Sequence, residues 1–587
     1  MSQQFNEVRV GTSARSTFDL SHHQVTTTDF GYLIPICVRD MIPNDDFVVT
    51  PSLFCRLAPM AHPTYGRILA RVHSFFVPYR ILYPHWSEWI TGSQGNNTIP
   101  PYFTASVLRQ ALATDPQFSN TQGLTLPRGI YGRLMANLGL NPEVFSHTQD
   151  YGGVSNNDRF SAFRFLAYYR IYCDWFMDSN LNNHAAVIAY FNDIIKDGGS
   201  LIGSATEFLR TQCCCFGKDY FTTAKLHPQA GSNPSTVGVG LADSSLNPGM
   251  VFSSVQNPIR ATSEGYPYTA VQATDPVPSG TNSIIGQFTV EELRAATSLQ
   301  RYLERNNYVG TKVINQLLAH FGIAPTPERL DMSEYIGGSN FPIQIGDVTS
   351  TTPVSSESIN TVGLGAQAGK GVGAASSETV RYHAKEHGVF MTLLSIVPET
   401  GYYQGIPKEF SLGVTGDPLD YYTPEFENLG YQEILNKEVY VPSLWDGSDS
   451  AHSSSFDPDG IFGYSPRYAF MKFQRDILSG DFIGTLSQSA VMGAQMDSWH
   501  LFRKLRYYTS DEDPLALNEN FVKLDRVNTD YDRIFQVTNN DLDHFYFNID
   551  VDVKATRDMV GFAEPSLDSV NSDDGQKINL PYGGTRL

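Results

Sequence analysis

A His-x-x-Glu-His sequence is the pattern in this chain that comes closest to a metal-dependent active site. His383 and His387 lie four residues apart with Glu386 beside the second of them. On a helix this spacing places both imidazoles on one face, where they can bind zinc while the Glu acts as a base. Gly388 follows at once and leads into an apolar β-type run, and a Gly- and Ser-rich stretch precedes the motif. No stable helix is therefore expected here, and we predict no metal site.

Two further patterns with possible chemistry fail on their spacing or surroundings. The glycine-rich stretch 363–371 resembles a phosphate-binding loop, but that loop needs Gly where this chain has Leu364 and Ser or Thr where it has Gly371. Asp550 and Asp552 share one strand face without a third polar partner, so a solvated face is expected rather than an acid–base pair. The six cysteines form no Cys-x-x-Cys pair, which favours reduced thiols over a zinc site. We predict no catalytic residue, no cofactor and no enzyme activity.

Basic and aromatic side chains alternate in two segments, 467–475 and 499–508. Such mixtures can bind phosphates while the rings stack on unpaired bases. Arginines that cover a core patch with their stems are the alternative explanation. The candidates for contact with DNA are Arg467, Lys472, Arg475, Arg503, Lys504 and Arg506.

The composition limits the possible functions. With 61 acidic and 41 basic residues among 587, the formal net charge is −20, so the chain is not built mainly to coat phosphate backbones and any DNA contact must be local. Only 17% of residues are charged and 12% are aromatic, beside 48 Gly and 33 Pro, which is typical of a loop-rich β protein with large contact surfaces. The longest apolar run, 389–397, is far shorter than the roughly 20 residues of a membrane-spanning helix, so no membrane insertion is expected.

The elements that must position these residues are mainly short strands separated by prolines. Val-, Ile-, Tyr- and Phe-rich runs at 30–38, 47–50 and 67–83 suit a pleated, half-buried surface. The run 388–397 is almost wholly apolar, which predicts a strand buried on both faces, and residues 545–553 alternate as in a one-sided strand. This pattern predicts a sandwich or barrel.

Helices and loops are expected between the strands. Apolar residues recur every three or four positions in 159–177, in 185–191 and in 289–321, the last interrupted at Gly310 and ending at Gly322. The predicted organisation is an N-terminal arm (1–28) followed by a single domain (29–587) with insertions: a helical and loop insertion (93–227), a surface loop (228–286) and a Gly/Ser-rich loop (350–377).

An ordered set of short motifs resembles the major capsid protein of microviruses, small tailless icosahedral phages. The N-terminal motifs are Leu20–His22, Asp29–Pro35, Asp40–Pro43, Arg56–Pro59 and His73–Arg80 followed by Trp86. Later motifs resemble the gokushovirus-type branch: Tyr302–Asn306, His320–Ile323, Glu334–Gly338, Glu386–Gly388, Tyr403–Gly405, Leu435–Glu438, Phe462–Tyr468 and Trp499–Leu501.

This resemblance implies an eight-stranded antiparallel viral jelly roll with long insertions, which assembles through pentamers into a T=1 icosahedral shell around circular single-stranded DNA. It also implies a virion location with assembly in the bacterial host cytoplasm, and as partners a small basic DNA-packaging protein, pilot or minor proteins, scaffold proteins and a host surface receptor. In the gokushovirus branch an insertion forms protrusions at the threefold axes. The loop 228–286 is our candidate for it, with Asn233, Val239, Pro248, Tyr266 and Pro276 as candidate residues.

Two other functions are compatible with a β-rich, loop-rich chain. The first is a virion spike or receptor-binding protein, which copy number would distinguish from a shell protein. The second is a glycan-processing β enzyme with paired carboxylates, for which the chain shows no carboxylate pair in a suitable environment.

Overall fold

The computed structural model describes residues 15–92, 99–114, 129–145, 154–201, 203–230, 290–349, 367–413, 421–427, 429–441, 457–483, 496–505, 517–525, 531–536 and 542–559. The chain divides into two compact units. The first consists of residues 1–228 and 309–587, and the second of residues 229–308.

Eight strands build the first unit, in two groups of four. One group has the order β2-β14-β4-β10 and the other β3-β11-β5-β8, and every pairing is antiparallel. Their bounds are β2 His22–Thr28, β3 Ile34–Met41, β4 Asp46–Leu57, β5 Ile68–Pro78, β8 Glu334–Thr349, β10 Val380–His383, β11 Gly388–Pro398 and β14 Phe545–Arg557. Successive strands cross from one group to the other except between β5 and β8. This is the connectivity of a jelly roll, so the predicted fold class is confirmed.

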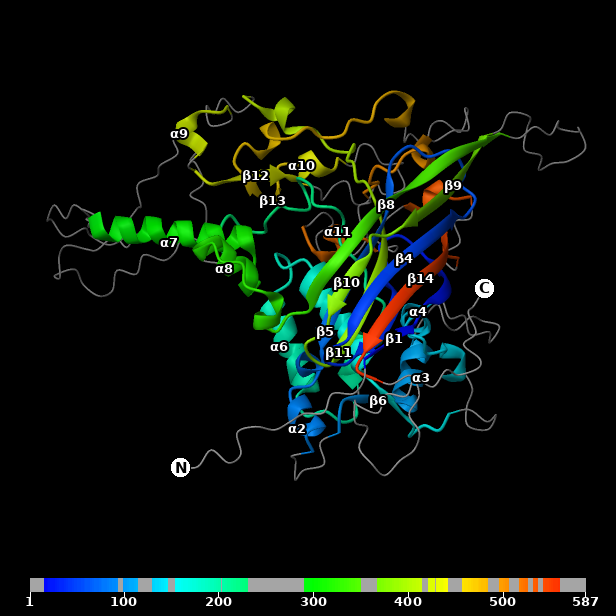
Figure 1. Ribbon diagram of the computed structural model, residues 1–587. Coiled ribbons are helices and arrows are strands. Elements are labelled where there is room, and N and C mark those ends of the chain that lie inside the picture. The colour runs from blue at the N-terminus through cyan, green and yellow to red at the C-terminus, as the bar shows by residue number, and fades with distance from the viewer. Residues whose placement is uncertain are drawn as a thin grey trace, which may run out of the picture. The chain divides into compact units, whose positions relative to one another are not determined.

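Two additional strands modify the sandwich. β1 (Ser16–Asp19) extends the β2 edge of β14, and β9 (Gln367–Ser376) pairs with both β4 and β8. The long strands β4, β14, β8 and β9 run side by side (Figure 1). Through β9 the two groups become one curled sheet that is continuous on one side.

On the other side, β2 and β3 lie next to each other without ladder pairing among the described residues. Side chains connect them instead. Nε2 of His22 lies 3.4 Å from the backbone carbonyl oxygen of Ile36. The side-chain amide of Gln24 donates a hydrogen bond to the backbone carbonyl oxygen of Pro35, also at 3.4 Å. We call this boundary between β2 and β3 the seam.

Two connections hold most of the remaining elements. Between β5 and β8 lie α1 Tyr79–Leu82, α2 Trp86–Ile90, β6 Tyr102–Thr104, α3 Ala105–Thr114, α4 Ile130–Asn137, β7 Arg159–Ser161, α5 Phe163–Ile171 with a π-helical turn to Phe176, α6 His184–Ile195, α7 Val290–Val309 and α8 Val313–Phe321. Between β11 and β14 lie α9 Pro424–Glu427, β12 Tyr431–Leu435, α10 Asn436–Val439, β13 Ile461–Pro466 and α11 Glu519–Val522. Most of α7 belongs to the second unit. None of the helices in the described parts of the chain is long and apolar enough to cross a membrane.

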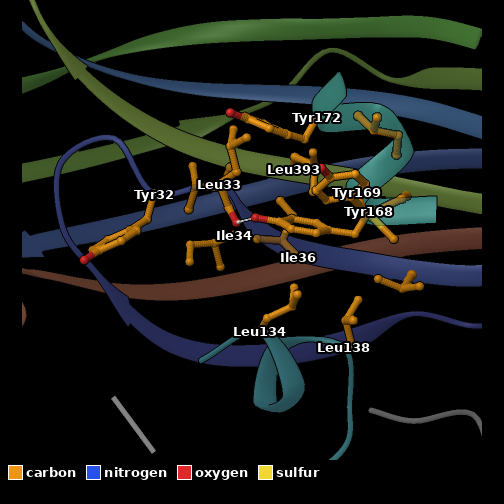
Figure 2. Packing of buried hydrophobic residues seen from close by; sticks show 14 of the residues in the cluster. Tyr32, Leu33, Ile34, Ile36, Leu134, Leu138, Tyr168, Tyr169, Tyr172 and Leu393 are labelled. Atoms are coloured by element: carbon orange, nitrogen blue, oxygen red, sulfur yellow. Dashed lines mark hydrogen bonds between the residues drawn. The ribbon is translucent and has the colours of Figure 1, made fainter. Parts of the chain in front are cut away.

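The main core lies between the two groups of strands, where Phe47 of β4 meets Phe390 of β11, and continues between the β3-β11-β5-β8 group and the helices α4 and α5. Figure 2 shows Tyr168 of α5 beside β3, where its hydroxyl donates to the carbonyl oxygen of Leu33 at 3.0 Å and accepts from the amide of Gln212 at 2.8 Å. Leu134 and Leu138 approach Ile36 from below. The aromatic run of α5 is thus a buried helix, as its spacing predicts.

A second, smaller core joins the two long connections. Its buried side chains are Phe221, Ala224, Ile434, Val439, Tyr440, Phe462, Leu517, Phe521 and Val522. Segments more than two hundred residues apart in the sequence therefore stabilise one another here.

Several sequence predictions are confirmed by these elements. Every residue of β11 is buried, and β14 alternates buried and exposed positions from Phe545 to Ala555. Helix α8 ends at Gly322, whose φ of +69° satisfies the left-handed helix end that glycine permits. All six cysteines are free thiols, five of them buried.

Two predicted loop-like segments are ordered strands. Residues 16–28, predicted as part of an extended arm, form β1 and β2 on the chain's own sheet. Residues 367–376, predicted as part of a Gly/Ser-rich loop, form β9. Close packing requires glycine at position 369 of β9, because a Cβ there would lie 2.5 Å from the backbone carbonyl oxygen of His62, and a Cβ on Gly371 would lie 2.7 Å from the side chain of Leu57. Segment 350–366 lies outside the described residues.

Candidate nucleic-acid contacts

The first basic and aromatic segment follows β13. Tyr468, in a left-handed backbone conformation with φ of +59°, is buried and donates its hydroxyl to the carbonyl oxygen of Tyr421 at 3.1 Å. This anchor is followed by the exposed side chains of Met471, Lys472 and Phe473. The ammonium of Lys472 lies 3.3 Å from a carboxylate oxygen of Glu427, and both groups are exposed to solvent.

A surface hollow of about 540 Å³ opens at the same place. Its lining residues are Glu409, Leu412, Phe470, Met471, Lys472, Phe473 and Gln474. Phe410 and Ile477, in adjoining parts of the chain, are 77% and 75% exposed. An exposed cation beside exposed rings is the combination that single-stranded nucleic acid binds.

Two of the other candidate cations pack against aromatic rings of the second core. Arg503 is 5% exposed, and its guanidinium lies 4.1 Å from the ring of Phe216 and 4.4 Å from that of Phe521. It donates to the carbonyl oxygen of Phe521 at 2.9 Å and to the hydroxyl of Tyr402 at 3.1 Å. Arg475 lies 4.9 Å from the ring of Phe221, and burial lowers the pKa of its guanidinium. Both arginines contact the second core, as the alternative explanation of these segments anticipates.

The remaining candidates are divided by the structure. Arg467 and Lys504 are half-buried, and the guanidinium of Arg467 lies 5.7 Å from the ring of Tyr468. Arg506 lies outside the described residues, as do all five candidates for the threefold protrusion, Asn233, Val239, Pro248, Tyr266 and Pro276. Among the described candidates, Lys472 is the one that is exposed.

A positively charged hollow at the seam is a feature that the sequence analysis missed. It has a volume of about 560 Å³ and lies between β2, β3 and α4, with His22, His23, Arg39, Arg133 and Arg164 in its lining. Asp543 is the one carboxylate in the lining, and it is bound to Arg133. The basic residues come from four elements, so no local spacing in the sequence signals them.

Arg39 gives this hollow its charge. Its guanidinium lies 3.2 Å from Nδ1 of His22 and donates to the carbonyl oxygens of Val38 and Leu20 at 3.3 and 3.5 Å. Its Nε is buried without a hydrogen-bond partner among the described residues. Burial, and then the charge of Arg39, hold the pKa of His22 below its usual range.

The His-x-x-Glu-His residues take up separate structural roles. His383 ends β10 and lies 2.7 Å from Asp46, whereas Glu386 accepts two hydrogen bonds from the Nε of Arg80 at 2.9 and 3.1 Å. His387 packs against the ring of Trp86 at 5.6 Å. The segment is a turn between strands, as Gly388 predicts, and not a helix. Asp550 and Asp552 are exposed on the outer face of β14, as expected for a solvated face.

Comparison with known proteins places the whole chain among phage capsid proteins. Residues 6–567 match the family described as capsid protein (F protein). The chain is 26% identical to capsid protein VP1 of Chlamydia phage 1, over 97% of this chain and 98% of that protein. It is also 26% identical to capsid protein VP1 of Bdellovibrio phage phiMH2K, over 94% and 96% of the two chains. With capsid protein VP1 of Spiroplasma virus 4 it shares 24% identity, over 83% and 84%.

These matches confirm the resemblance found in the sequence motifs, and they agree with the jelly roll. The residues with possible chemistry serve folding or face solvent, so the function follows from the architecture. The chain is a structural protein of the virion, and it belongs to the phage capsid protein (F protein) family.

Proposed function

We propose that this protein assembles through pentamers into a T=1 icosahedral shell that encloses a circular single-stranded DNA genome. The observation that carries the proposal is the complete jelly roll in a chain that matches capsid proteins over nearly its whole length. The sandwich forms the body of each shell subunit, and the two long connections provide surfaces for contacts between neighbouring subunits. A spike or receptor-binding role is less well supported, because the chain matches proteins named as capsid proteins over nearly their full length.

The test is the sedimentation of the recombinant full-length protein, with negative-stain imaging of every species heavier than a monomer. Pentamers or uniform closed shells support the proposal, with or without added assembly partners. A protein that stays monomeric or trimeric in the presence of the phage's own assembly partners contradicts it and favours the spike alternative.

The charge balance supports a second component in the particle. A subunit with a net charge of −20 cannot neutralise DNA phosphates by itself, so cations must come from elsewhere. We propose a small basic DNA-packaging protein on the inner wall, together with pilot or minor proteins and scaffold proteins during assembly in the host cytoplasm. Purified particles that contain DNA but no second, basic chain would contradict this proposal.

Direct contacts with DNA are proposed at the surface cations that remain. Lys472 in the hollow after β13, together with the half-buried Arg467 and Lys504, are candidates, and the hollow at the seam around Arg39 is another. The exposed ring of Phe473 supports Lys472, because a base can stack on it. The position of Arg39 in the lining of the hollow supports the second.

For the outer surface, we propose that segment 228–286 forms protrusions at the threefold axes and takes part in binding a host receptor. Its Gly-, Ser-, Asn- and Pro-rich composition supports a projecting loop. Particles assembled from a chain with this segment deleted should lose the protrusions in negative-stain averages. An unchanged outline would contradict the assignment.

We further propose that the protein has no enzyme activity. Offering a panel of host polysaccharides to purified particles and measuring their hydrolysis would test this.

A further inference from the structure

The short helix α8 presents its apolar side to solvent. Apolar residues occupy positions 313, 314, 317, 318 and 321, and at about 100° per residue they fall within roughly 140° of the helix circumference. A stripe of this kind normally packs on the core. No residue of α8 is buried, however, and Val313, Leu318 and Phe321 are 58%, 54% and 72% exposed. Ile323, just beyond the helix end at Gly322, is 59% exposed. We call these apolar residues the α8 stripe.

The polar side chains of α8 bind its own chain. The ammonium of Lys312, at the helix start, donates to the carbonyl oxygen of Asp174. The side-chain amide of Gln316 donates to the carbonyl oxygen of Gly310 at 2.6 Å. Gly310 is buried, and a Cβ on it would lie 2.9 Å from the hydroxyl oxygen of Ser179. The start of the helix is therefore fixed in an orientation that leaves the α8 stripe in water.

The α8 stripe is large enough to form the centre of an interface. The four side chains that are more than half exposed leave roughly 400–500 Å² of mostly apolar surface in contact with water. Single apolar residues are common on protein surfaces, but a contiguous patch of this size marks an interaction site. A standard protein–protein interface takes about 800 Å² from each partner. The α8 stripe therefore supplies about half of one partner's share.

The chemistry of the α8 stripe selects an apolar protein surface as its partner. None of its side chains carries a charge, so it offers no cation to DNA phosphates and no carboxylate to a small basic protein. Lys312, at the helix start, is already bound to the carbonyl oxygen of Asp174. A capsid protein assembles with copies of itself. A surface of a second copy is therefore the partner that fits.

We propose that the α8 stripe is a contact between neighbouring copies of this chain. The inference rests on the proposed assembly into a shell, and it names a surface that carries one of the contacts. Burial against a second copy removes the stripe from water, which is the driving force of most protein association. The sequence analysis predicted the helix from its apolar spacing but not its outward orientation. Periodicity alone does not distinguish a stripe that packs on its own core from one that packs on a partner.

Assembly of charged variants tests the proposal. Phe321→Lys and Leu318→Lys each place a charge in the α8 stripe, whereas Phe321→Leu keeps the stripe apolar and is the matched control. All three should keep the wild-type Tm as monomers, because both positions are exposed. Where the wild type forms pentamers or shells, the lysine variants should leave about tenfold less protein in species heavier than a monomer. Phe321→Leu should assemble as the wild type does. Lysine variants that assemble equally well would overturn the proposal.

Photo-crosslinking identifies the partner without relying on loss of assembly. The full-length chain, with a photoreactive benzoylphenylalanine in place of Phe321, is prepared with natural and with heavy nitrogen, and the two preparations are mixed before assembly. Crosslinked peptides that combine both labels support a contact between copies. Crosslinks confined to one label would place the stripe against its own chain, and crosslinks to another protein of the particle would give it a different partner. Either result would overturn the proposal.

Failure of this contact is distinguishable from failure of the proposed function. A wild-type protein that stays monomeric in the presence of the phage's own assembly partners would overturn the shell, and with it this contact. Shells that the lysine variants build as readily as the wild type would overturn the contact alone.

Discussion

The guanidinium of Arg133, in α4, donates two hydrogen bonds to the carboxylate of Asp543, at 2.8 and 2.9 Å, and both side chains are almost fully buried. Each terminal nitrogen of the guanidinium bonds a different carboxylate oxygen, and the guanidinium also lies 4.7 Å from the ring of Tyr32. This pair joins the helical insertion after β5 to the residues that begin β14.

We expect Arg133→Met to destabilise the protein by about 3–5 kcal/mol, because the change leaves a buried carboxylate without its partner. The double variant Arg133→Met/Asp543→Leu should recover much of this loss, since it removes both charges. Urea unfolding of the single and double variants measures the difference. A double variant no more stable than Arg133→Met would show that packing of the arginine, rather than its charge, determines the stability here.

Asp174 should contribute to unfolding in acid. Burial by itself would raise the pKa of this carboxyl group, but hydrogen bonds from His184 and Ser333 and the charge of Arg170 hold the pKa below its usual range. A carboxyl group with a lowered pKa in the folded state stabilises the protein above its unfolded pKa of about 3.9, and this stabilisation is lost as the pH falls through the folded pKa.

Asp174→Asn should therefore destabilise the protein at pH 7 and flatten the dependence of unfolding free energy on pH below about pH 4. Urea unfolding between pH 7 and pH 3 tests this expectation. Asp550→Asn, on the exposed face of β14, is the control and should keep the wild-type slope. If Asp174→Asn also keeps that slope, the acid response originates elsewhere.

The glycines of β9 offer a test of close packing. Gly369→Ala should destabilise the protein by about 1–3 kcal/mol, because its Cβ would lie 2.5 Å from the backbone oxygen of His62. Gly346→Ala, on the paired strand β8, has its nearest neighbour at 3.9 Å and should change the stability by less than about 0.5 kcal/mol. Thermal unfolding of the two variants compares them. Equal effects would mean that glycine is needed in these strands for its backbone freedom and not for space.

The DNA-contact candidates separate into surface and core residues, and charge changes should separate them too. Lys472→Glu should lower the DNA content of purified particles without lowering Tm, because this side chain is exposed, and Lys504→Glu should also lower the DNA content. Arg503→Met should lower Tm by several degrees, because the guanidinium packs between Phe216 and Phe521. Absorbance at 260 and 280 nm and differential scanning fluorimetry give the two readouts. Unchanged DNA content in both lysine variants would direct attention to Arg39 at the seam.

Much of the fold could be predicted because its signals are local. The alternation in β14, the apolar run of β11, the aromatic spacing of α5 and the stop at Gly322 each lie within one element. The errors have a shared cause. β2 and β9 are polar or glycine-rich, and they become strands only because β14, β4 and β8 present edges to them.

The candidate site was harder to predict for the same reason. From the sequence, Arg503 and Lys504 are two neighbouring cations, yet the structure places one among aromatic rings and leaves the other at the surface. The hollow at the seam is formed by residues that only the tertiary structure brings together.

The sandwich is held together more weakly at the seam than at β9. Where β9 joins the two groups of strands, opening the sandwich would break a backbone ladder on both sides of that strand. Between β2 and β3, the contacts found among the described residues are made by side chains such as those of His22 and Gln24. We therefore expect the swelling of a shell to begin at the seam. Amide hydrogens should also exchange there first under mildly destabilising conditions. The jelly roll is therefore expected to open at the seam, with β9 as the hinge.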